Sequence, residues 1–351
     1  MKDDPKPLRR GWTTGACATA ATRAGLMALW GEGFPEKVRI TLPKGERPEF
    51  ELSYTTSGPD WAEVGIIKDA GDDPDVTHGA EIRVRVSRSS GGVVFKAGAG
   101  VGTVTKAGLP IGVGEPAINP VPREMMRAQV TEMAARLGQV PDIEITVSIP
   151  DGDTIALKTW NPRLGIVGGL SVLGTTGVVR PFSCAAWIAS IHRGIDVARA
   201  EGLTHLSGCT GTTSERIVQA HHNLSDAAML DMGDFVGGML KYLVKHPVER
   251  VTIGGGIGKL AKLAQGAMDL HSKRGQVDLA FWADRLGLPD IASANTALDA
   301  TQIAGPVFAQ SVAELALETV NARFKTATDG ASISYDIVVI DRAGAILATA
   351  S

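Results

Sequence analysis

The sequence predicts two domains: an α+β domain followed by a Rossmann-like α/β domain built on a parallel sheet. A length of 351 residues suits two domains better than one. In the first half, strand-like runs surround two helical runs. From about residue 161, short apolar runs alternate with Gly/Thr loops and helical runs. We therefore expect domains at 1–160 and 161–330, with 331–351 returning to one of them as a strand or hairpin.

The first domain begins with an alanine-rich helical run, and Thr13 or Thr14 is its expected N-cap. The run at 81–87 alternates apolar and polar residues, which is typical of a half-buried strand. The glycine-rich stretch 95–123 has no regular period, so we expect an ordered loop or a loop between short strands, and loops of this length are usually functional. The expected elements are, in order, a helix at 17–30, strands at 37–43, 50–56, 62–69 and 81–87, a helix at 123–138 ended by Gly138, and a strand at 142–150.

The second domain is expected to repeat one unit four times: a short apolar strand, a loop of glycine or threonine, and a helix. Such alternation implies a parallel sheet with helices on its faces. Later stretches predict further helices at 276–286 and 293–322 and a strand or hairpin at 335–349. The four units begin at "GGLSVLGTTGVV" (168–179), "LTHLSGCTGTTS" (203–214), "AAMLDMGD" (227–234) and "VERVTIGGGIG" (248–258).

Composition excludes several classes of protein. The net charge is -3 and aromatic residues make up 5%, with no block of Lys or Arg, so a nucleic-acid partner is not expected. The three cysteines are far apart and form no CxxC pair, which argues against a disulfide framework or a structural zinc site and fits a reducing compartment. The N-terminal residues lack the apolar core of a secretory signal, and no apolar run is long enough to span a membrane. We expect a cytoplasmic protein without a membrane partner.

In an open parallel sheet, ligands bind beyond the carboxyl ends of the strands. The four loops expected there should lie on one edge and offer backbone N–H groups, hydroxyls and two carboxylates. Helix N-termini behind them favour anionic groups. The alternative is that these are plain strand–helix turns. The loop residues are Gly174 to Gly177, Gly208 with Thr210 to Thr213, Asp231 with Gly233 and Asp234, and Gly254 to Lys259.

Nucleotide-binding motifs are incomplete. A P-loop requires Ser or Thr after its Gly-Lys, but Leu260 follows Lys259, and Ile253 stands where the first glycine belongs. The dinucleotide fingerprint also fails, because Lys259 replaces its third glycine. A phosphoryl-transfer enzyme that uses Lys259 therefore stays only as a minor alternative. Cys209 could be a nucleophile at a strand end, but a lone cysteine is more often a small buried residue.

The stretch "AGDDPDVTHGAEI" (70–82) concentrates acids and one histidine around Pro74. A hard cation could bind there, yet the order of side chains does not match a calcium loop. Pro74 fixes a turn, and Asp72 or Asp73 can cap it. From composition we interpret the stretch as a turn, with a metal site as the minor alternative.

Six stretches, taken together, resemble the CbiD family, the cobalt-precorrin-5B (C-1)-methyltransferases of cobalamin biosynthesis. They occur in order from about residue 9 to beyond 272, which is most of the chain. Each alone is weak, but the combination is specific. They are "GWTTGACATAATRA", "AGDDPDVTHGAEI", "GAGVGTVTKAGLPIGVGEPAINPVPREM", "GGLSVLGTTGVVRPFS", "DMGDFVGGMLK" and "GGGIGKLAKLAQGAMDLHS".

The resemblance implies that S-adenosylmethionine donates a methyl group to carbon 1 of cobalt-precorrin-5B, giving cobalt-precorrin-6A in anaerobic-type synthesis of the corrin ring. It also implies an α+β first domain and a Rossmann-like second domain. Cobalt would arrive within the tetrapyrrole substrate, so no metal site of the protein is required. A tetrapyrrole-binding carrier without catalysis is an alternative, and a homo-oligomer is compatible with the sequence.

Site residues follow from this resemblance and from the loops above. Our hypothesis is that the 70–82 loop faces the reacting edge of the ring, where the catalytic candidates Asp75 and His78 manage a proton or hold the turn; a rigid turn at the domain junction is the alternative. Free N–H groups and cations suit the substrate's acetate and propionate groups. Cofactor binding is expected at Gly174, Thr175, Thr176, Gly208, Thr210, Gly211, Asp231 and Asp234. Substrate binding is expected at Thr13, Thr14, Gly100, Gly102, Asn119, Arg123, Gly254, Gly256, Gly258 and Lys259.

Overall fold

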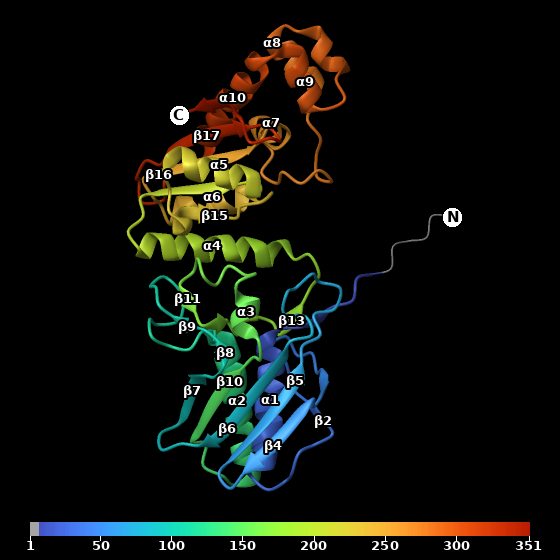
Figure 1. Cartoon of the computed structure of the whole chain (residues 1–351), viewed down its shortest axis with the longest axis vertical. Coiled ribbons are helices and arrows are strands. Elements are labelled where there is room, and N and C mark those ends of the chain that lie inside the picture. Colours follow the sequence, from blue (N-terminus) through green and yellow to red (C-terminus); the bar gives the residue numbers. More distant parts are fainter. Residues whose placement is uncertain (1–6) are drawn as a thin grey trace, which may run out of the picture. The chain divides into compact units, whose positions relative to one another are not determined.

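The chain forms two compact units, each with its own five-stranded sheet (Figure 1). The computed structural model describes residues 7–351, and the division falls between Ser183 and Cys184. This lies beyond the boundary at 160/161 expected from the sequence. The segment 166–179 belongs to the first unit because its short strands pair with strands there. The expectation of two units that combine sheets and helices is confirmed.

The main sheet of the first unit has the order β4-β5-β6-β10-β7, and neighbours are antiparallel except for the parallel pair β10 and β7. Apolar and polar side chains alternate along its strands, so one face of the sheet is buried. In β6 the buried residues are Ile82, Val84 and Val86, as the period-2 pattern predicted. The strands are β4 (Tyr54–Gly58), β5 (Trp61–Ile67), β6 (Glu81–Arg88), β7 (Val93–Ala97) and β10 (Ile143–Ser148).

Two helices, α1 (Thr14–Leu29) and α2 (Pro120–Leu137), pack on each other, and α1 also packs on β5 and β6. The hydroxyl of Thr13 accepts a hydrogen bond from Ala16 N at 3.2 Å, which makes it the N-cap of α1. Helix α2 begins at Pro120, and Gly138 in the left-handed conformation (φ 63°) ends it. Most residues of α1 are small, so the helix approaches its neighbours closely and is buried over its first three turns.

Short paired segments complete the first unit. The segment 168–179 does not begin a strand–loop–helix unit of the second sheet, so the prediction of four such units is wrong for the first of them. Its residues instead pair with the glycine-rich stretch and with the N-terminal residues of the chain. The elements are β1 (Gly11–Trp12) with β13 (Val178–Val179), β8 (Gly100–Val101) with β12 (Gly169–Leu170), β9 (Thr103–Val104) with β11 (Ile166–Val167), β2 (Lys37–Arg39) with β3 (Glu49–Glu51), and helix α3 (Gly152–Ala156).

The sheet of the second unit has the order β15-β14-β16-β17-β18. The first four strands are parallel, and β18 runs antiparallel beside β17, so the late hairpin returns to this unit. The strands are β14 (His205–Cys209), β15 (Met229–Leu230), β16 (Arg250–Gly256), β17 (Ser334–Ile340) and β18 (Ile346–Ala350).

Helices cover both faces of this sheet. Along β17, Val338 packs on the side of α5, whereas Ile337 and Val339 belong to the core formed with α4, α6, α7 and α10. The helix expected at 293–322 is broken at Gly305–Pro306, since proline cannot continue a helix. The helices are α4 (Cys184–Ala200), α5 (Thr212–His222), α6 (Val236–Lys245), α7 (Ile257–Ala264), α8 (Leu279–Leu286), α9 (Ala297–Ala304) and α10 (Pro306–Phe324), with 3-10 turns η1 (Asp226–Ala228) and η2 (Pro289–Ser293).

A histidine cluster lies at the amino-terminal end of the second sheet. Nε2 of His205 is 2.8 Å from the Thr252 hydroxyl, which donates to Asp336 at 3.1 Å. Nε2 of His222 is buried and has no hydrogen-bond partner within residues 7–351. Burial lowers the pKa of both imidazoles below the ordinary value, and the Arg250 guanidinium lowers the pKa of His205 further.

The free energy of unfolding should fall as the pH drops below about 6.5, the ordinary pKa of histidine. In that range the unfolded chain binds protons that the folded chain excludes, so stability is lost between this value and the lowered pKa values. Urea unfolding at a series of pH values measures the slope, and joint replacement of His205 and His222 by asparagine should flatten it. His271→Asn, in an exposed loop, is the control. Equal slopes for the double variant and the unaltered protein would contradict the prediction.

Candidate functional site

The carboxyl ends of β14, β15 and β16 meet at one edge of the second sheet. Thr210 N donates to Gly254 O at 3.0 Å, and Gly233 N donates to Cys209 O at 3.0 Å, so the three loops touch one another. From β14 the chain passes to β15 on one side, and it then crosses to β16 on the other. The order of strands therefore reverses between β14 and β16, and such a reversal opens the crevice where open α/β sheets bind ligands.

Lys259 and Asp234 meet at this edge. The Lys259 ammonium donates to Thr210 O at 2.9 Å and lies 3.0 Å from Asp234 Oδ1. Oδ1 of Asp234 is buried, and despite this ion pair its geometry gives it no hydrogen-bond partner in the described chain. The Asp234 side chain is nevertheless 20% exposed, so its carboxylate can accept a hydrogen bond from a hydroxyl group of a ligand.

The glycines predicted at this edge divide into two kinds. A β-carbon on Gly208 would overlap Met239, and one on Gly254 would overlap Val218, so both are glycine for core packing. Beside Gly211 and Gly256, by contrast, no atom lies within 4 Å of the β-carbon position, and Gly258 meets only Ala297 at 3.9 Å. The open backbone of the second kind remains available to a ligand.

Cys209 lies beside these glycines, in the core under the edge. Burial raises the pKa of its thiol to about 12. The thiolate that nucleophilic catalysis requires is therefore not formed near neutral pH. The reading of Cys209 as a small buried residue fits this environment.

Trp187 of α4 borders the same edge, and the sequence gave no reason to select it. Its indole N–H donates to Asp231 O at 2.9 Å, and its ring lies 3.5 Å from the β-carbon position of Gly233. The side chain nevertheless remains 46% exposed. A held, half-exposed indole beside open backbone offers a stacking surface for a flat ligand.

In the first unit, the N-termini of α1 and α2 meet the segment 172–177. Thr13 N donates to Gly177 O at 3.0 Å, Gly15 N donates to Leu173 O at 3.1 Å, and Asn119 N donates to Val172 O at 2.9 Å. Gly174, Thr175 and Thr176, which were expected at the edge of the second sheet, therefore lie in the first unit beside Thr13 and Asn119. Thr175 is exposed, whereas Thr14 is 4% exposed and inaccessible to a ligand.

Gly100 and Gly102 are surrounded by backbone rather than open space. A β-carbon on Gly100 would overlap the carbonyl oxygen of Ile149, and one on Gly102 would meet Ile166 Cγ2 at 2.5 Å and Gly169 O at 2.9 Å. The chain between β10 and α3 approaches Gly100, and the segment 166–169 approaches Gly102. These close contacts account for both glycines without a ligand.

Asp75 in the 70–82 loop forms an ion pair with Lys68, whose side chain is 2% exposed. Its carboxylate also accepts hydrogen bonds from the amide and hydroxyl of Thr77 at 2.8 and 2.6 Å. Burial alone would raise the pKa of Asp75, but Lys68 and Thr77 hold that pKa below its ordinary value. A carboxylate so stabilised is a weak base, which favours a structural role.

The rest of this loop ties distant parts of the first unit together. Asp72 accepts from Arg9 N at 2.6 Å, and Asp73 accepts from Phe182 N at 2.8 Å. His78 Nδ1 accepts from Ala70 N at 3.1 Å, so its Nε2 carries the ring proton in the neutral form. The His78 side chain is 53% exposed. Of the two catalytic candidates, only His78 has a group free to meet a substrate.

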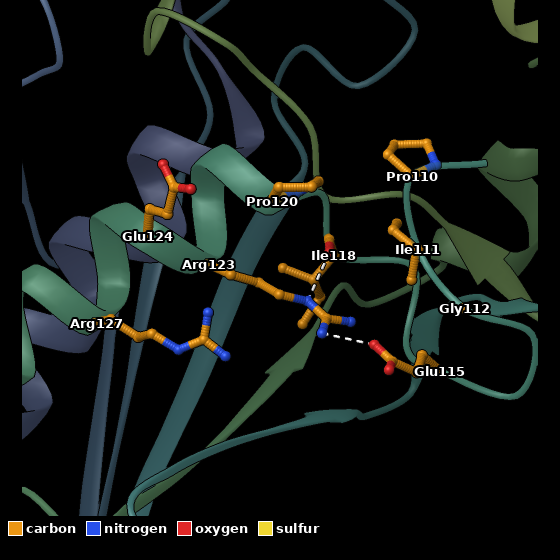
Figure 2. Close-up of a pocket in the computed structure, with 9 residues that line it drawn as sticks. All are labelled: Pro110, Ile111, Gly112, Glu115, Ile118, Pro120, Arg123, Glu124 and Arg127. Carbon is orange, nitrogen blue, oxygen red and sulfur yellow. Dashed lines mark hydrogen bonds and ion pairs between the residues drawn. The ribbon is translucent and has the colours of Figure 1, made fainter.

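Figure 2 shows a pocket of about 250 Å³ at the N-terminal turns of α2. Arg123, predicted from the sequence, lines it, and Arg127 one turn later was not predicted. Both guanidinium groups lie over the Phe95 ring, at 5.5 and 4.9 Å from its centroid. The lining residues are Pro110, Ile111, Gly112, Glu115, Ile118, Pro120, Arg123, Glu124 and Arg127.

Among residues 7–351, no three His, Cys, Asp or Glu side chains are grouped so that they could hold a metal ion. No helix in the same range has the length and apolar character needed to cross a membrane.

Known proteins are similar to nearly the whole chain. A family model described as CbiD matches residues 1–181. A protein named cobalt-precorrin-5B C(1)-methyltransferase from Paramagnetospirillum magneticum is 53% identical over 358 residues and covers 99% of each chain. Another of that name, from Brucella anthropi, is 56% identical over 351 residues, which is 97% of this chain and 95% of the relative. A crystal structure of the cobalamin biosynthesis protein (cbiD) from Archaeoglobus fulgidus is 28% identical, covers 80% of this chain and 85% of that chain, and has a TM-score of 0.42.

Proposed function

Since the chain belongs to the CbiD family, we propose that it is a cobalt-precorrin-5B C(1)-methyltransferase, which methylates carbon 1 of a cobalt-bound tetrapyrrole and forms cobalt-precorrin-6A. The observation that carries this proposal is the near-complete similarity to relatives of that name, at 53% and 56% identity. The cytoplasmic location expected from the sequence is part of the proposal. Cobalt belongs to the substrate, so the protein needs no metal ligands of its own.

We propose S-adenosylmethionine as the methyl donor and the edge of the second sheet as its site. The strand order and the helices on both faces support a Rossmann-like unit with its crevice between β14 and β16. The residues there fit the cofactor: Asp234 has acceptor capacity for ribose hydroxyls, Gly211 and Gly256 leave room, and Trp187 offers a surface for adenine. When bound, the cofactor supplies an electrophilic methyl group.

For this kind of methyl transfer the protein must mainly align the methyl group with the acceptor carbon and exclude water. Alignment can contribute about 7–11 kcal/mol in the best cases, and no covalent intermediate with the protein is required. The anionic arms of the tetrapyrrole need cations, which the first unit offers at the arginine-lined pocket on α2. His78 is the residue of the 70–82 loop that can hold or move a proton at Nε2.

Two other functions have less support. A tetrapyrrole carrier would bind the macrocycle without the methyl donor. A phosphoryl-transfer enzyme would place a metal–nucleotide complex at Lys259, but this lysine is engaged by Thr210 O and Asp234, and Leu260 follows it.

Methyl transfer itself is the direct test. The protein is incubated with cobalt-precorrin-5B and S-adenosylmethionine labelled in its methyl group. Labelled cobalt-precorrin-6A is the expected product. Binding of the tetrapyrrole with no transfer of label would favour the carrier instead.

Asp234→Asn should weaken the binding of S-adenosylhomocysteine by about 10- to 100-fold, the loss expected for one hydrogen bond to a charged group. The reason is that the variant replaces the carboxylate that we assign to the ribose with a neutral amide. Isothermal titration calorimetry measures the change. Asp269→Asn is the matched control, because that carboxylate pairs with the exposed Arg274. Unchanged affinity in Asp234→Asn would move the cofactor to another loop.

A further inference from the structure

The pocket on α2 has charged side chains on one side and apolar side chains on the other. Its residues come from the first two turns of the helix and from the loop 110–118 that precedes it (Figure 2). Pro110, Ile111, Ile118 and Pro120 supply the apolar wall. The volume of about 250 Å³ is several times the roughly 30 Å³ that one water occupies in the liquid. One small acidic arm fits, whereas a whole tetrapyrrole ring does not.

Neighbouring groups of the pocket hold the Arg123 side chain in a fixed position. Its guanidinium donates to Ile118 O at 2.8 Å and to Pro116 O at 3.0 Å, and it pairs with Glu115 at 2.6 Å. Its donors are therefore largely used, and its charge is neutralised by a neighbouring carboxylate. Arg123 therefore has little hydrogen-bonding capacity or net charge left to offer an incoming anion.

Arg127 differs in every one of these respects. No carboxylate within the described residues lies at ion-pair distance from it, and its one recorded interaction is with the Phe95 ring, 4.9 Å away. Figure 2 shows its side chain leaving α2 on the same side as Arg123, whereas Glu124 points the opposite way. The positive charge of Arg127 is therefore not balanced by a carboxylate of the described residues.

We propose that this pocket is a carboxylate subsite, in which Arg127 pairs with one acetate or propionate arm of the tetrapyrrole while the ring stays outside. The inference rests on the proposed function, because that function supplies a substrate rich in such arms. Arg127 has its planar fork of donors unused, and a carboxylate is the anion that this fork matches with two parallel hydrogen bonds. Phe95 holds the guanidinium in place, which reduces the entropy lost on binding. The arm's methylene groups pack on Ile111 and Pro110.

The subsite predicts discrimination between a free acid and its ester. A methyl ester has no charge, so it forms no ion pair with Arg127 and gains far less from it than a carboxylate does. The probes are cobyrinic acid, a corrinoid with free acetate and propionate arms, and its fully methylated ester, both titrated by calorimetry. Arg127→Gln should weaken cobyrinic acid binding by about 10- to 100-fold and weaken ester binding much less. Arg127→Lys keeps the charge without the fork and should recover part of the loss.

Arg136→Gln is the matched control. It removes an arginine from the last turn of the same helix, where Arg136 pairs with Glu32, and it should bind cobyrinic acid as the unaltered protein does. Thermal unfolding of each variant verifies the fold. Equal affinity of Arg127→Gln and the unaltered protein for cobyrinic acid would overturn the subsite, as would equal losses for acid and ester or no binding of cobyrinic acid at all.

The same proteins separate failure of the subsite from failure of the function. If the unaltered protein transfers the labelled methyl group and Arg127→Gln binds cobyrinic acid normally, the subsite is wrong and the methyltransferase stands. If no methyl is transferred but the binding of cobyrinic acid depends on Arg127, the subsite is supported and the protein is a tetrapyrrole carrier. S-adenosylhomocysteine affinity should be the same in both proteins, because Arg127 lies in the first unit.

Discussion

Replacing Asp75 by alanine should lower the free energy of unfolding by about 3–5 kcal/mol, because it leaves the buried Lys68 ammonium without its partner. The loss is large since Lys68 is 2% exposed, and among the described residues its ammonium keeps only the neutral Thr77 hydroxyl as an acceptor. Urea unfolding near neutral pH measures it. The lowered pKa of Asp75 gives the matching pH dependence: this contribution is present above the ordinary aspartate pKa of about 3.9 and is lost as the pH falls through the lowered value.

A double replacement separates the buried charge from other effects of Asp75→Ala. Adding Lys68→Met removes the stranded ammonium and should restore most of the lost stability. His78→Ala in the same loop is the comparison, and it should cost only about 0.5–1.5 kcal/mol for one hydrogen bond. If Asp75→Ala instead kept full stability and lost turnover, Asp75 would act on the substrate and the structural role would be wrong.

Gly100→Ala should destabilise the first unit by more than about 4 kcal/mol, enough to prevent recovery of folded protein. Gly100 has φ +73°, which disfavours any side chain, and its β-carbon would overlap the Ile149 carbonyl oxygen. Gly152 N and Cα lie at 2.9 and 3.0 Å from the same position, so no rotation relieves the overlap. Circular dichroism and urea unfolding of the purified variant provide the measurement.

Gly33→Ala is the matched control for this substitution. Gly33 has φ +78°, but no atom lies within 4 Å of its β-carbon position. Its loss should be only the cost of the left-handed conformation, about 1–2 kcal/mol. The difference between the two variants measures the cost of the overlap with the backbone of Ile149 and Gly152. Near-normal stability of Gly100→Ala combined with weak corrinoid binding would return Gly100 to the substrate site.

Sequence patterns predicted the elements well wherever one local period decides the outcome. The alternating run of β6 and the strand–loop–helix units at 203–264 follow directly from side-chain spacing. The segment 168–179 shows the limit, because it carries the same local pattern yet pairs with β1 and β8, far away in the sequence. Pairing at that distance leaves no mark in a single sequence. The break between α9 and α10 at Gly305–Pro306, by contrast, can be predicted from the sequence, since a proline within a helical run indicates a helix boundary.

Some residues of the candidate sites could likewise be predicted from local patterns, and others only from the folded structure. The loops at Gly211, Asp234 and Lys259 could be brought to one edge by reasoning about parallel strands alone. Arg127 could also have been found, as it follows Arg123 by one turn of a predicted helix. Trp187 could not, because only the folded unit shows that its indole is held at Asp231 and Gly233.

The separation of β17 from β16 in the chain has a consequence for synthesis on the ribosome. β17 pairs along its whole length with β16, yet β16 ends at Gly256 and β17 begins at Ser334. The first unit ends at Ser183 and can close while the remainder is still being translated. The second unit must wait with an unpaired edge on β16 until almost all of its residues have emerged. We expect this interval to be the stage at which nascent chains aggregate or recruit chaperones.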